Sequence, residues 1–274
     1  MSERRIGSYK KITSVSNPLV KEIRGLHQKK HRDAGRWFLA EGQKLVHGAL
    51  DARWAIRTLI YAAQSAGDPA VGSLAARAKS SGGQVLEVTR QILEKISRRD
   101  NPQAVLGVFE QRLADLEAVG RDGLWLALER VRDPGNLGTI LRTCDATGVS
   151  GVVLVGETCD PFSVEAVRAT MGSLFHIPLV RCSERAFVEH MRQVPARLVG
   201  THLEASVDYR SGDYRQPLIL VMGNEQQGLT PALAVACDQL IRIPMVGHAD
   251  SLNLAVSTGL MIYEALRATL PDAG

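Results

Sequence analysis

The second half of the chain alternates short, uniformly apolar segments with segments of helical character, and this restricts the folds open to it. Strands are expected at residues 124–128, 152–155, 177–180, 197–201, 218–222 and 239–243, and helices at 136–146, 163–171, 186–193 and 251–270. A strand that is apolar at every position is typical of a parallel sheet covered on both faces. The sequence therefore predicts an α/β domain built on a parallel sheet.

The first half predicts a smaller α/β unit of ~100 residues. A capped helix is expected over 12–30, because Asn17 can cap it and Pro18 suits the first helical turn. Further expected strands cover residues 36–40, 57–61, 84–88 and 105–109, with helices between them.

Charge divides the chain in the same way. Residues 1–115 contain 20 Lys and Arg against 11 Asp and Glu, a net charge of +9, whereas residues 116–274 have a net charge of −5. A polar segment that breaks at Gly120 and Gly123 lies between the two parts. We therefore predict two domains, 1–115 and 116–274. A basic module beside an acidic one is typical of a polyanion-binding domain joined to another activity, although a solvated basic surface would have the same composition.

Several classes of protein are disfavoured by what the sequence lacks. No apolar run approaches the ~18 residues of a membrane helix, and the first residues have no apolar core of a secretory signal. The four cysteines have no C-x-x-C spacing, which favours reduced thiols in the cytoplasm over a disulfide framework or zinc site. His27 and His31 have helical spacing but no acidic or Cys neighbour, so no metal site is expected.

Three polar, glycine-rich loops follow expected strands, at residues 129–138, 223–228 and 244–253. Ligands of parallel α/β sheets bind where loops leave the carboxyl ends of the strands. Glycine lets the backbone approach a ligand closely, and helix N-termini offer free N–H groups. These loops are therefore the candidate site.

The usual nucleotide motifs do not fit these loops. Leu229 and Thr230 stand where a P-loop needs Lys and then Ser or Thr, and the G-x-x-G at 135–138 is not a dinucleotide fingerprint. Ser251 lacks the G-x-S-x-G context of a hydrolase nucleophile, so Ser251 or Asp250 is expected to cap the last helix. Likewise, we expect Cys144 to pack inside its helix rather than to act as a nucleophile.

Together the three loops resemble the motifs of the SpoU/TrmH family (SPOUT superfamily) of RNA 2′-O-ribose methyltransferases. Residues 126–147 (LALERVRDPGNLGTILRTCDAT) resemble motif 1, residues 219–231 (ILVMGNEQQGLTP) motif 2, and residues 241–256 (IRIPMVGHADSLNLAV) motif 3. The segment ITSVSNPLVKEIRGLHQKK and the later FLAEGQKLVHGAL are similar to the L30e-like RNA-binding domain of rRNA-type members.

The resemblance implies a SPOUT domain with a trefoil knot, an L30e-like N-terminal domain, a homodimer, and S-adenosylmethionine bound in the knot. The cofactor-binding residues implied are Thr201, Gly223, Ile243, Met245 and Leu252.

The same resemblance implies a catalytic group made of Arg142, Asn136, Glu225, Ser251 and Asn253. The family assigns Arg142 the activation of the ribose 2′-hydroxyl. Because arginine is not deprotonated in proteins, a clamp on the neighbouring phosphate that also stabilises the developing alkoxide is the physically better role. Ser251 and Asn253 are expected to position the ribose or phosphate, and Glu225 and Asn136 to brace the network.

The expected substrate is RNA. The residues expected to bind it are Lys21, Arg24, Lys29, Lys30 and Arg32. The basic first part favours large-subunit (23S) ribosomal RNA over tRNA. The alternatives are a tRNA 2′-O-methyltransferase, an RNA-binding protein that keeps the fold without catalysis, and a nicotinamide-dependent enzyme, which lacks its fingerprint.

Overall fold

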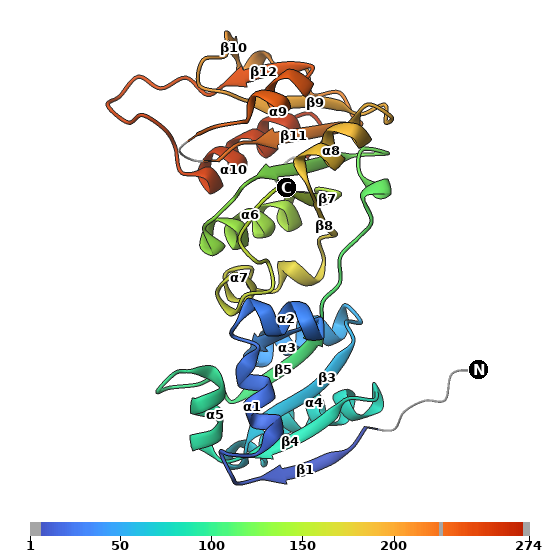
Figure 1. Cartoon of the computed structure of the whole chain (residues 1–274), viewed down its shortest axis with the longest axis vertical. Coiled ribbons are helices and arrows are strands. Elements are labelled where there is room, and N and C mark those ends of the chain that lie inside the picture. Colours follow the sequence, from blue (N-terminus) through green and yellow to red (C-terminus); the bar gives the residue numbers. More distant parts are fainter. Residues whose placement is uncertain (1–6, 225–226, 271–274) are drawn as a thin grey trace, which may run out of the picture. The chain divides into compact units, whose positions relative to one another are not determined.

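The computed structural model describes residues 7–224 and 227–270, which form two compact units (Figure 1). Unit 1 comprises Met1–Gln111 and Asp160–Phe175, and unit 2 comprises Arg112–Cys159 and His176–Gly274. Each unit has its own sheet. Within the described ranges, no helix is long and apolar enough to cross a membrane.

Unit 2 is built on a seven-stranded sheet in which every pairing is parallel. Its strands, in the order β10-β12-β9-β11-β6-β7-β8, are β6 (Leu124–Glu129), β7 (Gly151–Val155), β8 (Leu179–Cys182), β9 (Arg197–Thr201), β10 (Val207–Asp208), β11 (Leu218–Met222) and β12 (Gln239–Arg242). Every residue of β6, β7 and β11 is buried. The predicted parallel sheet is therefore confirmed.

The helices of unit 2 follow the predicted pattern with two differences. They are α6 (Pro134–Thr147), α8 (Glu184–Met191), α9 (Pro231–Ala236) and α10 (Leu254–Ala265). The predictions missed α9, and α10 begins later than expected because Asn253, rather than Ser251 or Asp250, is its N-cap. The polar segment between the two predicted domains contains the 3-10 turn Leu116–Ala118.

Unit 1 contains a mixed five-stranded sheet of order β1-β4-β3-β5-β2. Its elements are β1 (Tyr9–Ile12), α1 (Pro18–Gly25), α2 (Lys29–Gly35), β2 (Trp37–Glu41), α3 (Gln43–Asp51), β3 (Ile56–Ala62), α4 (Pro69–Ser80), β4 (Gln84–Val88), α5 (Arg90–Ser97), β5 (Val105–Glu110) and α7 (Val164–Ala169). The strands β1, β4 and β3 pair in parallel, whereas β5 is antiparallel to β3 and to β2.

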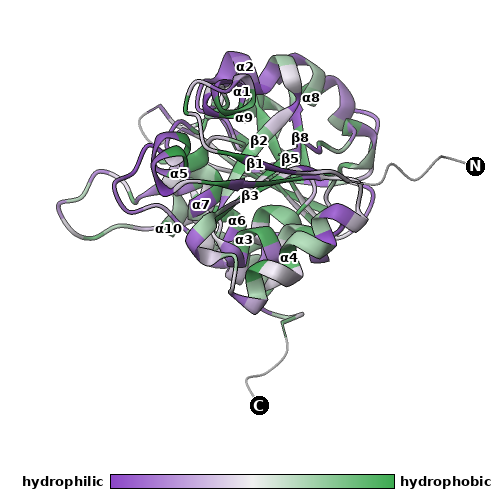
Figure 2. Ribbon diagram, turned by 90° about the horizontal axis from the view of Figure 1, so that it is seen from below, coloured by the Kyte–Doolittle hydropathy of each residue, from purple (hydrophilic) through white to green (hydrophobic). Residues whose placement is uncertain are grey.

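The helix expected over 12–30 is divided. Asn17 caps it as predicted, since its Oδ1 accepts a hydrogen bond from the Leu19 N–H at 2.9 Å. The helix ends at Gly25, where glycine weakens helical backbone, and the next helix, α2, is largely hydrophilic (Figure 2). The basic side chains of this region are therefore spread over two helices, α1 and α2.

The segment Asp160–Phe175, which comes from the second half of the sequence, completes the core of unit 1. The ring of Phe162 lies 5.1 Å from that of Phe38, and the ring of Phe175 lies 5.4 Å from that of Trp54. The Trp54 indole N–H also donates to the backbone carbonyl of Phe175 at 3.1 Å. Unit 1 is thus made of two separate segments of the chain, whereas the predicted domains are divided at one point, after residue 115.

Candidate active site

The loops that follow β6 and β11 leave the same edge of the parallel sheet and are bonded to each other. The Asn224 side chain donates to the carbonyl of Arg130 at 3.2 Å, and the Arg130 guanidinium donates to Gln227 Oε1 at 3.1 Å. The backbone N–H of Thr230 donates to the carboxylate of Glu129 at 2.9 Å. Motifs 1 and 2 are therefore fixed together by side-chain hydrogen bonds.

Asn253 joins the third loop to the first. Its Oδ1 accepts hydrogen bonds from the N–H groups of Ala255 and Val256, which caps α10. Its Nδ2 donates to Asn136 Oδ1 at 2.9 Å, and the Asn136 N–H donates to the Asp133 cap of α6. Two predicted site residues, Asn136 and Asn253, are thus brought together, and their hydrogen bonds hold the starts of two helices side by side.

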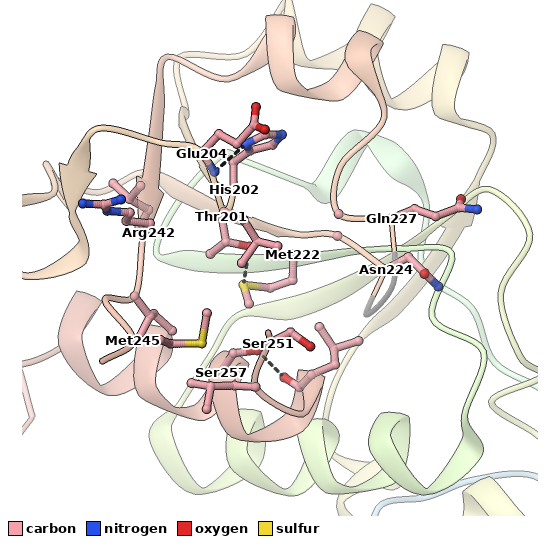
Figure 3. Close-up of a pocket in the computed structure, with 17 residues that line it drawn as sticks. Thr201, His202, Glu204, Met222, Asn224, Gln227, Arg242, Met245, Ser251 and Ser257 are labelled. Carbon is pink, nitrogen blue, oxygen red and sulfur yellow. Dashed lines mark hydrogen bonds between the residues drawn. The ribbon is translucent and has the colours of Figure 1, made fainter. Parts of the chain in front are cut away.

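A hollow of about 380 Å³ opens beside these loops (Figure 3). All five predicted cofactor-binding residues and Ser251 line it. The lining residues that the sequence did not single out include His202, Glu204, Met222, Arg242 and Ser257.

The hollow combines apolar walls with backbone polar groups. In Figure 3 the thioethers of Met222 and Met245 point into it. A Cβ on Gly223 would lie 2.3 Å from the backbone carbon of Gly228, so the turn at this wall has no room for a side chain at that position. A concave, largely apolar site with few polar groups and this volume suits a nucleoside-sized ligand.

Arg142 lies on α6 and is exposed. Among the described residues it has no hydrogen-bond or ion-pair partner, so its guanidinium is available to an anion. Glu225, the expected brace, lies outside the described residues. Cys144, two residues on, is fully buried, and burial raises the pKa of its thiol to about 12, which agrees with the expected packing role.

The sequence analysis did not single out Glu129, a buried residue of motif 1 that is bonded to motif 2. Glu129 ends β6 and is 1 % exposed, and its carboxylate lies 3.0 Å from Arg130 Nε as well as accepting from Thr230. A carboxylate directly after five apolar residues was the available signal, because a buried charge needs partners.

Four of the five residues expected to bind RNA are exposed, and one is not. Lys21 and Arg24 lie on α1, and Lys29 and Lys30 on α2. The prediction for Arg32 is wrong: it is 4 % exposed, its guanidinium lies 2.7 Å from Asp160, and it donates to the carbonyl of Leu26 at 2.7 Å. Arg32 is a structural residue of unit 1, held by a carboxylate more than a hundred residues away in sequence.

Comparisons with known proteins agree with the motifs. Residues 123–263 match the SpoU rRNA Methylase family, and residues 17–107 match the MRM3-like substrate binding domain. The chain is 31% identical over 260 residues to the 23S rRNA (guanosine(2553)-2′-O)-methyltransferase RlmP of Bacillus subtilis, covering 93% of this chain and 98% of that one. It is 33% identical to the 23S rRNA (uridine(2479)-2′-O)-methyltransferase of Streptomyces viridochromogenes, covering 84% and 82%.

A solved structure is similar along almost the whole chain. The AdoMet-bound rRNA methyltransferase from Sinorhizobium meliloti has a TM-score of 0.90 and 53% sequence identity, covering 96% of this chain and 99% of that one. The fold, the three joined loops and these similarities show that the chain belongs to the SpoU rRNA methylase family.

Proposed function

We propose that the protein transfers a methyl group from S-adenosylmethionine to a ribose 2′-hydroxyl of 23S ribosomal RNA. The observation that carries the proposal is the hollow lined by all five expected cofactor residues, at loops bonded to the helix that presents Arg142. The relatives named for 23S rRNA 2′-O-methylation, together with the net charge of +9 in residues 1–115, favour ribosomal RNA over tRNA.

The residues of the hollow fit S-adenosylmethionine. Met222, Met245 and Leu252 offer apolar walls for an adenine ring, and Gly223 and Ile243 line the same hollow, where their backbone groups would hydrogen-bond the ring. When bound, this cofactor supplies an electrophilic methyl group on a sulfonium.

The side chains of the site then have separable roles. Arg142 holds the phosphate next to the target ribose and stabilises the negative charge that develops on the 2′-oxygen, because its planar guanidinium stays charged. Ser251 offers a hydroxyl to the ribose. Asn136 and Asn253 act as positioning residues, since their mutual hydrogen bond fixes the start of α10 beside α6.

A homodimer, a C-terminal trefoil knot and a cytoplasmic location are parts of the same proposal. The stripe of Val256, Leu260 and Tyr263 on α10 supports the dimer, because these apolar side chains are 54%, 41% and 54% exposed at i, i+4 and i+7. Sedimentation of the purified protein tests it, and a Tyr263→Glu variant is expected to be monomeric.

Mapping of 2′-O-methyl groups tests the activity. Total ribosomal RNA and tRNA are isolated from cells that lack the protein. The RNA is incubated with the purified protein and S-adenosylmethionine, and ribose methylation is measured at each nucleotide. One new methyl group in large-subunit RNA is expected. A new site in tRNA alone would replace the proposed substrate, and no new site in either RNA would favour a non-catalytic RNA-binding protein.

A further inference from the structure

A second hollow, of about 380 Å³, lies within unit 1 at the start of α3. It is lined from several segments that are distant in sequence: the β2–α3 junction, the residues before β5, and the segment around α7. Its lining comprises Glu41, Gly42, Gln43, Lys44, Leu45, Arg99, Gln103, Ala104, Arg168 and Met171.

The buried polar group of this hollow is Glu41, the last residue of β2. Its side chain is only 3 % exposed, and its Oε1 has no hydrogen-bond partner among the described residues. The other oxygen, Oε2, lies 3.8 Å from Arg99 Nε, which is long for a hydrogen bond. A buried carboxylate without hydrogen bonds is costly, and burial correspondingly raises the pKa of Glu41.

Basic side chains line the hollow, and the charges that act on Glu41 itself are those of Arg99 and the acidic Glu165. Lys44, Arg99 and Arg168 line the hollow, and Lys44 and Arg168 are exposed, with no partner in the part of the chain that the structure describes. The nine-residue helix α3 begins here at Gln43, its N-cap residue Gly42 provides no side-chain cap, and its first turn has no acidic residue, so its first N–H groups are open to an anion.

An apolar side chain completes the rim. Met171 is 49% exposed and has a φ of 53°, an unusual backbone conformation for a residue other than glycine. An exposed thioether beside a pocket offers a surface on which a flat ring can pack.

We propose that this hollow binds one unpaired nucleotide of the substrate RNA, with the base donating N–H groups to Glu41 and the phosphate held by Lys44, Arg168 and the start of α3. The proposal rests on the function proposed above, since it names how unit 1 recognises the RNA. Unpaired bases are the usual target of sequence-specific RNA recognition because their edges are free.

Guanine fits this carboxylate best. Its N1–H and N2–H groups are adjacent donors, which a carboxylate can accept together, and the binding energy of such paired hydrogen bonds is large enough to discriminate between bases. Uracil presents one N–H group between two carbonyl oxygens. The carboxylate repels both of these oxygens. Inosine keeps N1–H and lacks the 2-amino group, so it isolates one of the two hydrogen bonds.

The test measures binding of the full chain to hexauridine RNA and to the same RNA with one central guanosine or inosine, by fluorescence anisotropy at fixed salt. Guanosine is expected to bind about tenfold tighter than uridine, with inosine between them. Equal affinity for the three RNAs, or no binding of the guanosine RNA at 1 mM, would overturn the proposal.

Variants separate recognition from folding. Glu41→Gln is expected to abolish the guanosine preference while leaving the melting temperature unchanged or higher, because it removes a buried charge that accepts no hydrogen bond and has only a long contact with Arg99. The matched control, Glu110→Gln, changes an exposed carboxylate of β5 and should keep the preference. Arg168→Ala should weaken binding of all three RNAs alike and reduce the salt slope by about 0.7. A Glu41→Gln variant that keeps the preference would contradict the assignment.

This test is independent of methyl transfer. If the protein prefers guanosine but does not methylate ribose, the nucleotide-binding role of the hollow stands and the proposed methyltransferase activity is wrong. If the protein methylates ribosomal RNA but Glu41→Gln does not change its base preference, the proposed activity stands and the nucleotide-binding role of the hollow is wrong.

Discussion

Each unit of the protein contains a buried glutamate at the end of a strand, Glu41 in unit 1 and Glu129 in unit 2, and the two carboxylates differ in their partners. In unit 2, Glu129 lies 3.0 Å from Arg130 Nε and accepts a hydrogen bond from Thr230. In unit 1, the Glu41 carboxylate accepts no hydrogen bond from the described residues, whereas Glu129 accepts the bond from Thr230 although its Oε1, like that of Glu41, has no hydrogen-bond partner there. The two carboxylates are buried to a similar extent. Their hydrogen-bond partners, rather than their exposure, therefore distinguish the carboxylate that joins two loops from the one that can receive a ligand.

The largest effect is expected from a third buried carboxylate, Asp160, which is paired with Arg32 at 2.7 Å. Asp160→Asn leaves the Arg32 guanidinium buried without its counter-charge, and should lower the free energy of unfolding by about 3–5 kcal/mol. Denaturant unfolding followed by circular dichroism measures this. The control Asp33→Asn, which breaks the exposed pair with Lys29, should cost about 0–1 kcal/mol; equal costs would mean that Asp160 does not hold unit 1 together.

The next effect compares the two glutamates directly. Glu129→Gln removes the counter-charge of the half-buried Arg130 guanidinium and should lower the free energy of unfolding by about 1–3 kcal/mol. Glu41→Gln should lower it by nothing measurable. If both variants lose the same stability in parallel denaturant titrations, the two carboxylates do not differ in the way proposed.

A smaller effect is expected at the joint between motifs 1 and 3. Asn253→Ala removes the N-cap of α10 and the hydrogen bond to Asn136, at a cost of about 0.5–2 kcal/mol. Asn253→Asp keeps the cap and loses the donor to Asn136, so it should restore most of the stability and little of the methyl-transfer rate. Recovery of both quantities would assign Asn253 a capping role alone.

The smallest effect concerns the exposed basic residues of α1 and α2. Replacing Lys21, Arg24 and Lys30 by Gln should reduce the salt dependence of RNA binding, by a slope of about 0.7 for each phosphate of single-stranded RNA that is no longer neutralised. Calorimetric affinity for S-adenosylhomocysteine should not change. An unaltered salt slope would mean that this basic surface is only solvated.

Local pattern predicted the parallel sheet and the three loops of the candidate site, because apolar strands fix where their carboxyl-end loops meet, whereas the individual pocket-lining residues were predicted from the family resemblance. Long-range pairing was not predictable in this way. Nothing near Arg32 indicates that its partner is Asp160, so a surface role was expected, and nothing near residue 115 indicates that Phe162 and Phe175 complete unit 1. A truncation after residue 115 would therefore leave Phe38 and Trp54 without these aromatic partners.

The central claim is that Arg142 acts on the RNA while the hollow of unit 2 binds the cofactor. One paired measurement tests it: the single-turnover rate of RNA methylation and the calorimetric affinity for S-adenosylhomocysteine, for Arg142→Ala, Arg142→Lys and the exposed control Arg192→Ala. Arg142→Ala should lower the methylation rate by roughly 10²–10³-fold and leave the cofactor affinity unchanged. Arg142→Lys should not restore the rate. The control Arg192→Ala should match the wild type in both quantities. A fully active Arg142→Ala variant, or one that loses cofactor affinity instead of rate, would contradict the account.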